Sequence, residues 1–477
     1  MDYKFKTVPY EHQLKALGAS HNKENFALFM EMGTGKSKVL IDNIAMLHDK
    51  GKINAAVIVA PKGVYRNWEK QEIPTHMPEH VPYKILVWNP TSTKFLKDYG
   101  AFIKDQDNLK IFLINIDAFS TSKGAEICKR FLTVTQCLMA IDESTTIKSP
   151  TAKRTKTVCS LRTLAKYRRI LTGSPVTKSP LDLYTQCYFL DPELLGHASY
   201  YSFKNRYAVM ISRSVATHSF KQIVDYQRLD ELEHKLNQFS YRVLKSECLD
   251  LPDKIYTKRY IEMTPEQKKA YVEMKNFAIS ILEKETVTAA GILTQMIKLH
   301  QITCGHLITD EGKTVELKNN RINELLNTLE EIDGKVIIWA IYRHDIKKIE
   351  EAIAQRYGEN SVKSYYGDTV DADRQDIVTA FQDRESDLRY FVGNPRTGGY
   401  GLTLTASNTI IYFSNSYDLE VRMQSEDRAH RIGQNKKVTY VDFIAEKTVD
   451  EKIIKSLRNK INIATKVLGE DFKEWLI

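Results

Sequence analysis

The chain has 477 residues, and its 69 lysines and arginines against 60 aspartates and glutamates give a net charge of +9 at pH 7. This length exceeds one ordinary domain and predicts about two to four units, each with enough chain to bury a core. Hydrophobic residues make up 42% and charged residues 27%, which excludes collagenous and broadly disordered proteins. The positive excess is spread along the chain, so by itself it indicates a polyanionic partner only weakly.

Cysteine usage and apolar run length bear on the compartment. The six cysteines form no C-x-x-C pair, so the sequence indicates neither a zinc ribbon nor a disulfide framework. We therefore expect a reducing intracellular compartment. The start of the chain has no apolar signal segment, and runs such as 336–342 are far shorter than the about 20 residues that span a bilayer. The sequence predicts neither export nor a membrane-spanning helix.

Short apolar runs rich in β-branched residues alternate with helical stretches along the chain. Strands separated by helices predict parallel sheets. The runs form two groups, and residues 184–333 between them are mostly helical, polar and charged in pattern. The sequence therefore predicts an α/β protein of two lobes with helical insertions. The predicted strands are 55–60, 111–116, 137–141 and 169–171 in the first group, and 336–341, 390–392 and 409–413 in the second.

The first chemical motif is a predicted strand, glycine loop and helix over residues 26–40. It ends in the Gly35-Lys36-Ser37 of the Walker A pattern G-x-x-x-x-G-K-[ST]. Gly33 and Gly35 free backbone N–H groups to face phosphate. Lys36 would reach the β- and γ-phosphates of a nucleotide, and Ser37 would offer its hydroxyl to Mg²⁺. The pattern favours nucleotide binding over the alternative of a glycine turn that only caps a helix.

A pair of carboxylates follows the apolar run 137–141. Asp142 would hold Mg²⁺, directly or through water, and Glu143 would orient and deprotonate the attacking water. The alternative is that Asp142 caps a helix and Glu143 has no special role. Because a Walker A lysine precedes the pair in the same lobe, ATP hydrolysis is the favoured interpretation.

Residues 424–434 (QSEDRAHRIGQ) carry two arginines in the second lobe. On a helix, Arg428 and Arg431 are three apart and would share a face. A guanidinium brought to a nucleotide stabilises charge on the transferring γ-phosphoryl, the role of an arginine finger, which we assign to Arg431. The alternative, a solvated charged helix face, would be preferred for this segment alone. The complete ordered set of motifs decides against it.

This ordered set resembles the Swi/Snf-type double-stranded-DNA translocases of helicase superfamily two, over most of the chain. The string Arg-Ala-His-Arg-Ile-Gly-Gln is the most family-specific match. The chain resembles a minimal viral or bacterial member, which implies the cytoplasm of a bacterium or of a virus-infected cell. The matching segments, in family order, are the glutamine motif at 9–14, E-M-G-x-G-K-[ST] at 31–37, motif Ia at 57–69, the D-E-x-x box at 142–145, motif III at 171–175, the basic segment at 242–254, motif IV at 336–342, motif V at 397–405 and motif VI at 424–434.

The resemblance implies two RecA-like lobes with parallel sheets flanked by helices. Lobe 1 would span residues 1–240, with a helical insertion near its end. Lobe 2 would span 241–477, with a helical insertion at 255–320 and a C-terminal helical segment at 448–477.

The resemblance also implies the ligands, ATP and Mg²⁺ in the nucleotide site and the phosphate backbone of duplex DNA with little sequence specificity. For each basic residue taken singly, a surface charge that keeps the protein soluble is about as good an explanation as a DNA contact. The nucleotide-binding residues would be Gln13, Met32, Gly33, Thr34, Gly35, Lys36, Ser37 and Gly401, with Ser37 and Asp142 at the metal; the DNA-binding residues would be Lys62, Arg66, Lys148, Arg343, Thr397 and Gly398.

Three departures from the family pattern leave the catalytic positions intact. Met30 stands where an acid is usual, Ser144-Thr145 replace the usual Gly/Ala-His, and Ala340-Ile341 replace a polar Ser-Gln pair. Trp68 and Trp339 are expected in the core, because a duplex translocase does not need exposed stacking aromatics.

We expect a monomeric, DNA-stimulated ATPase that translocates along duplex DNA without separating the strands and remodels protein–DNA or branched DNA complexes. One alternative is a strand-separating or branch-migrating helicase, for which a wedge hairpin and exposed stacking aromatics would be expected, and the sequence identifies neither. The other is a non-enzymatic clamp, against which the intact Lys36, Glu143 and Arg431 argue.

Overall fold

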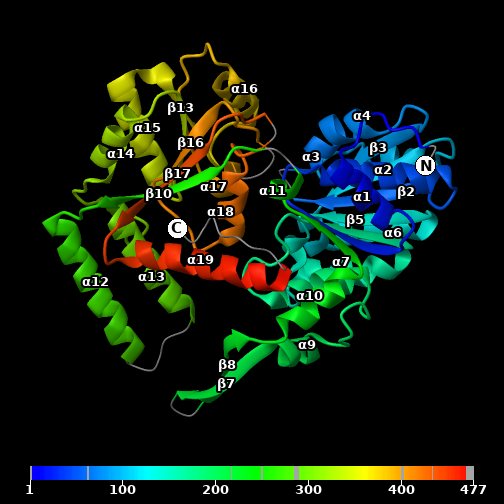
Figure 1. Cartoon of the computed structure of the whole chain (residues 1–477), viewed down its shortest axis with the longest axis horizontal. Coiled ribbons are helices and arrows are strands. Elements are labelled where there is room, and N and C mark those ends of the chain that lie inside the picture. The colour runs from blue at the N-terminus through cyan, green and yellow to red at the C-terminus, as the bar shows by residue number, and fades with distance from the viewer. Residues whose placement is uncertain are drawn as a thin grey trace. The chain divides into compact units, whose positions relative to one another are not determined.

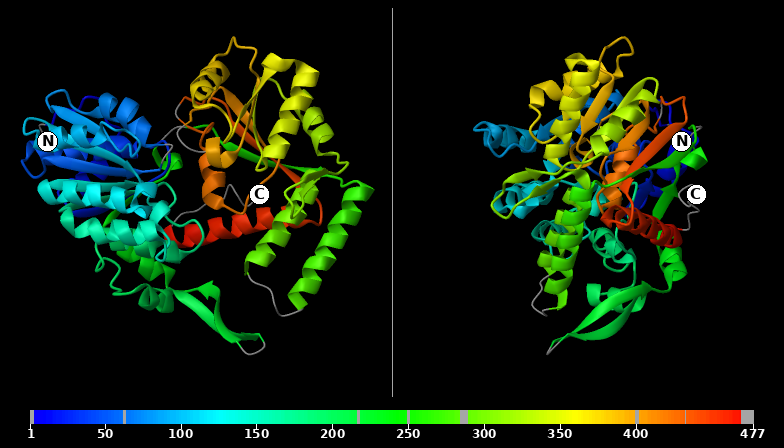
Figure 2. Two further views of the ribbon diagram at one scale, coloured as in Figure 1. Left: turned by 180° about the vertical axis from the view of Figure 1, so that it is seen from behind. Right: turned by 90° about the vertical axis from the view of Figure 1, so that its left-hand side faces the viewer.

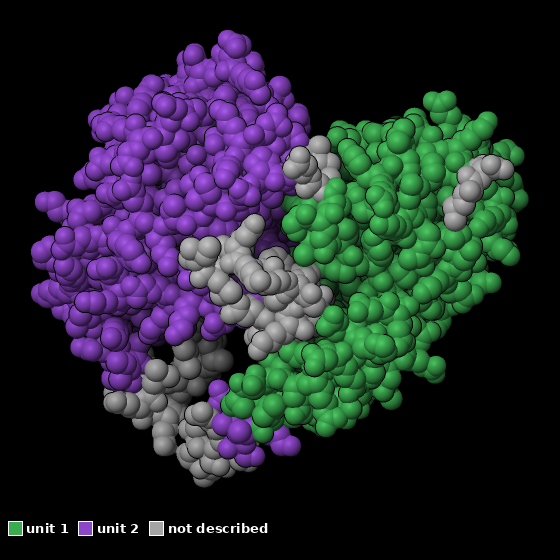
Figure 3. Space-filling model, in the orientation of Figure 1, with its two compact units in different colours: residues 1–210, 223–250, 463–470 green, residues 211–222, 251–462, 471–477 purple. Residues whose placement is uncertain are grey.

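The computed structural model describes residues 3–61, 64–215, 218–248, 251–283, 289–398, 402–431 and 433–468. The chain divides into two compact units, coloured separately in Figure 3. Residues 1–210, 223–250 and 463–470 form unit 1, and residues 211–222, 251–462 and 471–477 form unit 2.

Unit 1 is built on a seven-stranded parallel sheet in the order β3-β4-β2-β5-β6-β1-β9. Side chains of β2 alternate between two separate cores, with Val57 and Val59 in one and Ile58 in the other. Because successive side chains of a strand point to opposite faces, helices must cover both faces of this sheet. Figure 1 shows them there. The strands are β1 Asn25–Met30, β2 Ala55–Ala60, β3 Tyr83–Val87, β4 Leu109–Asn115, β5 Cys137–Asp142, β6 Tyr167–Leu171 and β9 Ser240–Val243.

The helices of unit 1 bury apolar stripes of the expected spacing. In α6, Ile127, Phe131 and their neighbours Cys128 and Leu132 recur four residues apart and are buried. The helices are α1 Glu11–Ser20, α2 Lys36–Asp49, α3 Tyr65–Asn67, α4 Ile73–His76, α5 Phe95–Lys104, α6 Ser122–Val134, α7 Lys153–Leu161, α8 Leu183–Leu190, α9 Tyr200–Tyr207, α10 Leu229–Asn237 and α11 Lys245–Cys248, with short 3-10 or π segments η1 Trp68–Glu72, η2 Ile116–Ser120, η3 Ser144–Ile147, η4 Arg162–Leu164 and η5 Pro180–Asp182.

Strands β7 Ala208–Val215 and β8 His218–Tyr226 form a two-stranded sheet that pairs with no other described strand. In Figure 2 this hairpin is a separate ribbon that continues from α9. The expectation that residues 184–333 are mostly helical is wrong here. The strands expose residues such as Ile211 and Val224, and an exposed strand carries little of the hydrophobic alternation that distinguishes a strand from a helix in the sequence.

Unit 2 is built on a six-stranded parallel sheet in the order β10-β17-β16-β13-β15-β14. Side chains of β13 again alternate between two cores, Val336 and Ile338 in one, Ile337 and Trp339 in the other. The strands are β10 Lys254–Ile261, β13 Lys335–Trp339, β14 Val362–Tyr365, β15 Tyr390–Gly393, β16 Ser407–Tyr412 and β17 Val438–Ala445, and β11 His306–Ile308 pairs antiparallel with β12 Thr314–Glu316.

The helices of unit 2 flank this sheet, and α19 follows directly on β17 in the chain. None of the helices in the described part of the chain is long and apolar enough to cross a membrane. The helices are α12 Pro265–Glu283, α13 Ala289–Cys304, α14 Arg321–Glu330, α15 Arg343–Tyr357, α16 Asp371–Gln382, α17 Pro395–Gly398, α18 Leu419–Glu426 and α19 Val449–Leu468, with the 3-10 segment η6 Glu359–Ser361.

The predicted fold class, two α/β lobes with parallel sheets flanked by helices, is confirmed, and each of the seven predicted strands is present. The boundary between the lobes lies later than residue 240, because β9 pairs with β1 and residues 223–250 belong to unit 1. The predicted insertion 255–320 is not helical at its start, since β10 pairs with β17 along its whole length. Helix α19 occupies the predicted C-terminal segment 448–477, whose residues 469–477 lie outside the described residues.

Candidate active site

The loop between β1 and α2 has a conformation that requires glycine. Gly33 has φ 82° and Gly35 has φ 87°, in the left-handed region where side chains are strained. A Cβ at position 35 would also lie 2.1 Å from Nε2 of Gln13. The backbone conformation therefore requires glycine at position 35, and a side chain there would also displace the Gln13 amide.

Lys36 is buried at the start of α2, where it lies against the loop. Its Nζ donates to the carbonyl oxygens of Met30 at 2.8 Å and Glu31 at 3.3 Å. The first N–H groups of a helix have no partner within the helix, and they face an anion favourably. Ser37 is half-buried, and its hydroxyl makes no hydrogen bond to any residue that the structure describes. A phosphate group at this helix end would meet one cation and several free N–H donors.

Helix α1 holds the loop from the other side. Gln13 Nε2 donates to the Thr34 carbonyl at 3.1 Å, and His12 Nε2 donates to the same oxygen at 2.7 Å. Gln13 Oε1 accepts from the Tyr10 N–H at 3.0 Å, so both ends of the predicted base-reading amide are bound within the protein. Tyr10 and His12 stack at 5.7 Å and line a pocket of about 690 Å³ with Arg242. This pocket beside the loop is large enough for a nucleobase.

Asp142 ends β5 and is held at both carboxylate oxygens. Trp68 donates its indole N–H to Oδ2 at 2.9 Å, and the Glu143 N–H donates to Oδ1 at 3.0 Å. Burial raises the pKa of Asp142, against the hydrogen bond from Trp68 and the charge of Lys36, which both lower it. The Lys36 ammonium is thus close enough to act on Asp142, which joins the first and second predicted motifs in one site.

Glu143 has an unusual backbone conformation. Its φ of 49° and ψ of 61° are left-handed, which costs a residue with a side chain about 1–3 kcal/mol and is found most often at functional sites. The Thr172 hydroxyl lies 3.4 Å from Glu143 Oε2. Ser144, one of the departures from the family pattern, donates to Gln186 Oε1 at 2.7 Å inside the protein. The Glu143 carboxylate is therefore oriented by its own backbone and by the end of β6.

Strand order explains why these segments meet. Strands β5, β6 and β1 are adjacent and parallel, so their carboxyl ends lie along one edge. A Cβ on Gly173, after β6, would lie 3.0 Å from the Met32 nitrogen of the glycine loop. Arg242 of β9 donates to the carbonyls of Phe29 at 3.0 Å and Gly173 at 2.9 Å. The sequence marked Arg242 only as part of a basic segment, and nothing local indicated this bridging role.

The residues at this edge fit a nucleotide with Mg²⁺. Ser37 and Asp142 offer hard oxygen ligands, which Mg²⁺ prefers, and Mg²⁺ commonly takes only one or two protein carboxylates beside phosphate and water. The described residues contain no group of three or more histidine, cysteine, aspartate or glutamate side chains that could hold a metal alone. Two protein oxygen ligands suit a metal ion that binds together with its nucleotide, whose phosphates supply further oxygen ligands.

The two arginines of motif VI lie in unit 2 and are not on a helix. Helix α18 ends at Glu426, so the expectation that Arg428 and Arg431 share a helix face is wrong. They converge nevertheless, because Nη1 of each donates to the Leu402 carbonyl, at 3.1 and 3.2 Å. Arg428 is 3% exposed and its Nε donates to the Gln424 carbonyl at 2.8 Å, whereas Arg431 is half-buried. The buried arginine is the more firmly held of the pair.

Three predicted ligand-binding positions cannot be placed. Lys62 and Gly401 lie outside the described residues, and the side chain of Arg66 does too. In unit 1, Lys148 is half-buried, and its Nζ donates to the Thr177 hydroxyl at 2.7 Å. Whether Lys148 contacts DNA stays a prediction.

The remaining DNA-binding candidates lie near one edge of the unit 2 sheet. Arg343 follows β13 and pairs with Asp368 at 3.0 Å. Thr397 and Gly398 follow the adjacent strand β15, and their N–H groups donate to the Asn394 carbonyl at 3.0 and 2.8 Å. A Cβ on Gly398 would lie 2.7 Å from the indole of Trp339, so this glycine is required by packing. Whether the Thr397 hydroxyl contacts a DNA phosphate stays a prediction.

Known proteins resemble the chain over nearly its whole length. The family described as "SNF2-related domain" matches residues 12–308, more than half of the chain, and the "Helicase conserved C-terminal domain" matches residues 317–433. The ISWI chromatin-remodeling complex ATPase CHR11 of Arabidopsis thaliana is 27% identical over 477 residues, which cover 94% of this chain and 41% of that protein.

Two further similar proteins come from microorganisms. An uncharacterized ATP-dependent helicase of Mycoplasma pneumoniae is 25% identical over 458 residues, which cover 95% of this chain and 41% of that protein. The solved Sulfolobus solfataricus SWI2/SNF2 ATPase core in complex with dsDNA is 25% identical, with a TM-score of 0.44, over 98% of this chain and 96% of that chain. The chain spans less than half the length of the curated relatives named here.

Proposed function

The chain belongs to the SNF2-related domain family, and from this membership and the site in unit 1 we propose that it is a DNA-stimulated ATPase that translocates along duplex DNA without separating the strands. The single observation that carries the hydrolase part is the meeting of Lys36 with the buried pair Asp142 and Glu143 at one sheet edge. Neither a glycine turn nor a helix cap requires a cation and two buried carboxylates together.

The residues divide the work of hydrolysis between them. Lys36 and the N-terminus of α2 bind the β- and γ-phosphates, and Ser37 with Asp142 holds Mg²⁺. When bound, Mg²⁺ neutralises charge that develops on the phosphate oxygens. Glu143 accepts a proton from the attacking water, and the Thr172 hydroxyl at 3.4 Å keeps its carboxylate in place. The Tyr10–His12 pocket beside the loop takes the adenine, and Gln13 holds the neighbouring Thr34 of the loop.

Replacement of the proposed base tests hydrolysis. Glu143→Gln keeps shape and size but cannot take a proton, so ATP turnover should fall by about 10²- to 10⁴-fold while nucleotide binding persists. Glu126→Gln is the matched control, because Glu126 is an exposed glutamate on α6. Turnover at the wild-type rate in Glu143→Gln would remove the assignment.

Arg431 is proposed as the arginine finger and Arg428 as its support. This role requires unit 2 to reach the nucleotide during turnover. It is supported by the difference in their surroundings, since Arg431 is half-buried and Arg428 is buried with two backbone acceptors. A guanidinium that must reach a ligand has to be at least partly exposed, as Arg431 is.

Duplex DNA is proposed as the track, contacted through its phosphates by Lys62, Arg66, Lys148, Arg343 and Thr397. The family membership supports this, and one relative is by name a chromatin-remodeling ATPase. Phosphate contacts release counterions, so stimulation of the ATPase by duplex should weaken steeply with salt. Linear duplex, single-stranded DNA and RNA are compared at equal nucleotide concentration. Equal stimulation by single strands, or none by duplex, contradicts the proposal.

Movement without strand separation needs its own assay. A translocase on intact duplex should displace the third strand of a triplex and leave a forked duplex paired. The opposite pair of results would favour a strand-separating or branch-migrating helicase.

The β7–β8 hairpin favours that second candidate. Its two strands pair only with each other among the described strands. A lone two-stranded hairpin is marginally stable in water, so this hairpin is a candidate for a functional element such as a wedge. Replacement of residues 209–225 by a short glycine-serine turn tests it. If fork unwinding is present and is lost in this variant while ATPase persists, the chain is a helicase with a wedge.

The biological setting is proposed more broadly. We propose that the chain acts as a monomer on protein–DNA or branched DNA complexes in a reducing compartment. All six cysteines are described, and all are free.

A further inference from the structure

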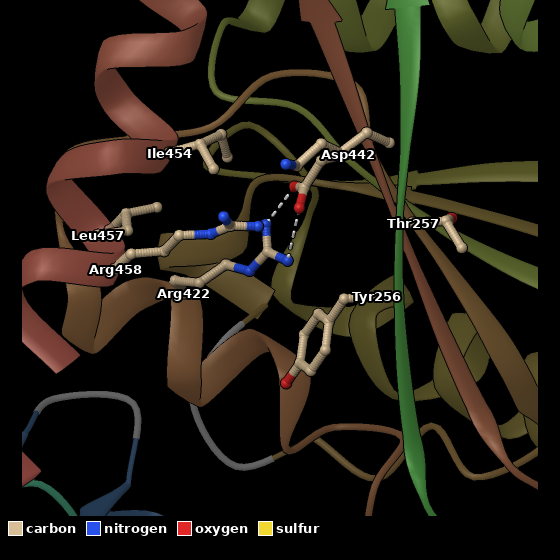
Figure 4. A pocket seen from close by; sticks show the side chains of 8 residues that line it. Tyr256, Thr257, Arg422, Asp442, Ile454, Leu457 and Arg458 are labelled. Atoms are coloured by element: carbon tan, nitrogen blue, oxygen red, sulfur yellow. Dashed lines mark hydrogen bonds and ion pairs between the residues drawn. The ribbon is translucent and has the colours of Figure 1, made fainter. Parts of the chain in front are cut away.

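Unit 2 contains a cavity of about 160 Å³ whose lining comes from β10, β17, α18 and α19 (Figure 4). Its walls include Tyr256, Arg422, Asp442 and Arg458. None of these residues belongs to the nucleotide site of unit 1 or is among the predicted DNA contacts. The cavity is too small for a nucleoside, since pockets for such ligands hold about 300 Å³ or more, but it exceeds the about 30 Å³ of one water.

Arg422 is fully committed at the floor of the cavity. Its guanidinium donates to both oxygens of Asp442, at 2.5 and 3.2 Å, and to Glu426 Oε1 at 2.7 Å. Glu426 also lies 3.7 Å from Lys254 Nζ and accepts from the Tyr256 hydroxyl at 2.9 Å. Two cations and two carboxylates thus balance, and this cluster carries no net charge.

Arg458 adds a positive charge that nothing balances. It is half-buried on α19, and no hydrogen bond or ion pair joins it to any residue that the structure describes. One turn away on either side of it the helix offers no acid, because positions 454, 455, 461 and 462 are Ile, Lys, Ile and Asn. Figure 4 shows its guanidinium beside that of Arg422.

Lys258 supplies a second unbalanced charge. It lines the same cavity and stands in register with Asp442 across the β10–β17 pair, yet makes no ion pair within the described residues. Like charges gathered in a recess repel one another, and an anion between them removes this cost. The lining therefore carries two positive charges that a ligand could neutralise.

We propose that this cavity binds one small oxyanion of the phosphate type, with Arg458 and Lys258 as its direct ligands and Arg422 behind them. A guanidinium fork matches the oxygens of phosphate, and two adjacent cations suit its double charge. The phosphate can be free in solution or part of a nucleic acid backbone. The site does not depend on the proposed ATPase activity.

Calorimetry with inorganic phosphate tests the site, at ionic strength held constant with chloride. All proteins carry Lys36→Ala, which weakens the phosphate loop of unit 1. This parent should bind phosphate with a Kd of about 10 mM or tighter. Adding Arg458→Met should weaken binding by about 10-fold or more, whereas adding Lys455→Met, which removes an exposed cation one turn away on α19, should not. Arg458→Lys should keep part of the affinity, because the charge remains and the fork is lost.

Short duplex DNA distinguishes the two sources of phosphate. If Arg458→Met weakens duplex binding more than Lys455→Met does, the cavity takes a backbone phosphate. If only the calorimetric binding falls, it takes the free anion. The proposal is overturned if the parent binds no phosphate, or if Arg458→Met and Lys455→Met behave alike in both assays. Thermal unfolding of each variant shows that a loss is not due to misfolding.

Discussion

Trp68 donates its indole N–H to the Asp142 carboxylate at 2.9 Å, across 74 residues of sequence. Both side chains are buried. Trp68 is 1% exposed, which confirms the prediction that it lies in the core. Burial raises the pKa of the Asp142 carboxyl, and this hydrogen bond opposes the rise because it favours the ionised form. A core tryptophan therefore also positions a proposed metal ligand.

Loss of this hydrogen bond should raise the Mg²⁺ requirement of the ATPase. In Trp68→Phe the Asp142 carboxylate loses a donor that orients it and helps to keep it ionised, so metal affinity or turnover should fall by about 10- to 100-fold. The measurement is ATP turnover against Mg²⁺ concentration. Trp339→Phe is the matched control, since Trp339 is also fully buried but its indole N–H has no hydrogen-bond partner among the described residues. If both variants shift the Mg²⁺ dependence equally, packing alone explains the effect.

The two arginines of motif VI should fail in different ways. Arg431→Ala should lower kcat by about 10³-fold with little change in ATP binding, because a finger acts on transition-state charge, and Lys should rescue it poorly. Arg428→Ala should lower the melting temperature instead, because it removes the Nε donor to the Gln424 carbonyl and one of the two arginine donors to the Leu402 carbonyl. Steady-state kinetics and thermal unfolding separate them. A dead Arg428→Ala beside a normal Arg431→Ala would reverse the roles.

Gly35→Ala should abolish nucleotide binding. The new Cβ would have to adopt φ 87° and would collide with Gln13 Nε2, so the loop must move away from the phosphate. Gly51→Ala is the control, because Gly51 also has a positive φ, of 63°, but open space around its Cβ. Nucleotide titration followed by fluorescence measures both variants, and binding at the wild-type level in Gly35→Ala would contradict the role of this loop.

Stability should fall in mild acid through His300. Burial lowers the pKa of His300 below its ordinary 6.5, so the folded state keeps it neutral while the unfolded state takes up a proton near pH 6.5. The unfolded state then binds more protons, and the melting temperature should drop as pH falls from about 7.5 to 5.5. Asp450, Arg321, Asp345 and His306 surround it.

A substitution isolates this contribution. His300→Asn keeps a partner for the Tyr342 hydroxyl, which lies 2.9 Å from Nδ1, but does not titrate, so the dependence on pH should become shallower. A residual slope is expected from His344, whose pKa burial also lowers. The control His234→Asn changes an exposed histidine. An unchanged slope in His300→Asn would contradict the assignment.

The sequence by itself determined the features that depend on short spacing. The glycine loop, the paired carboxylates and the seven predicted strands each lie within a few residues, where backbone preference and side-chain alternation decide the conformation. The two α/β lobes followed, because strands that alternate with helices can form only parallel sheets of this kind. The ordered motifs also predicted the family, without any contact known.

Tertiary structure alone decided the contacts between distant segments. Trp68 meets Asp142, and Arg428 and Arg431 meet at Leu402, because of strand order and the end of α18, which local patterns do not specify. The β7–β8 hairpin and β10 were hidden in a polar stretch, since an exposed strand carries little hydrophobic signal. The unbalanced charge of Arg458 likewise exists only where α19 packs against α18, because the net charge of a site depends on which neighbours folding brings to it.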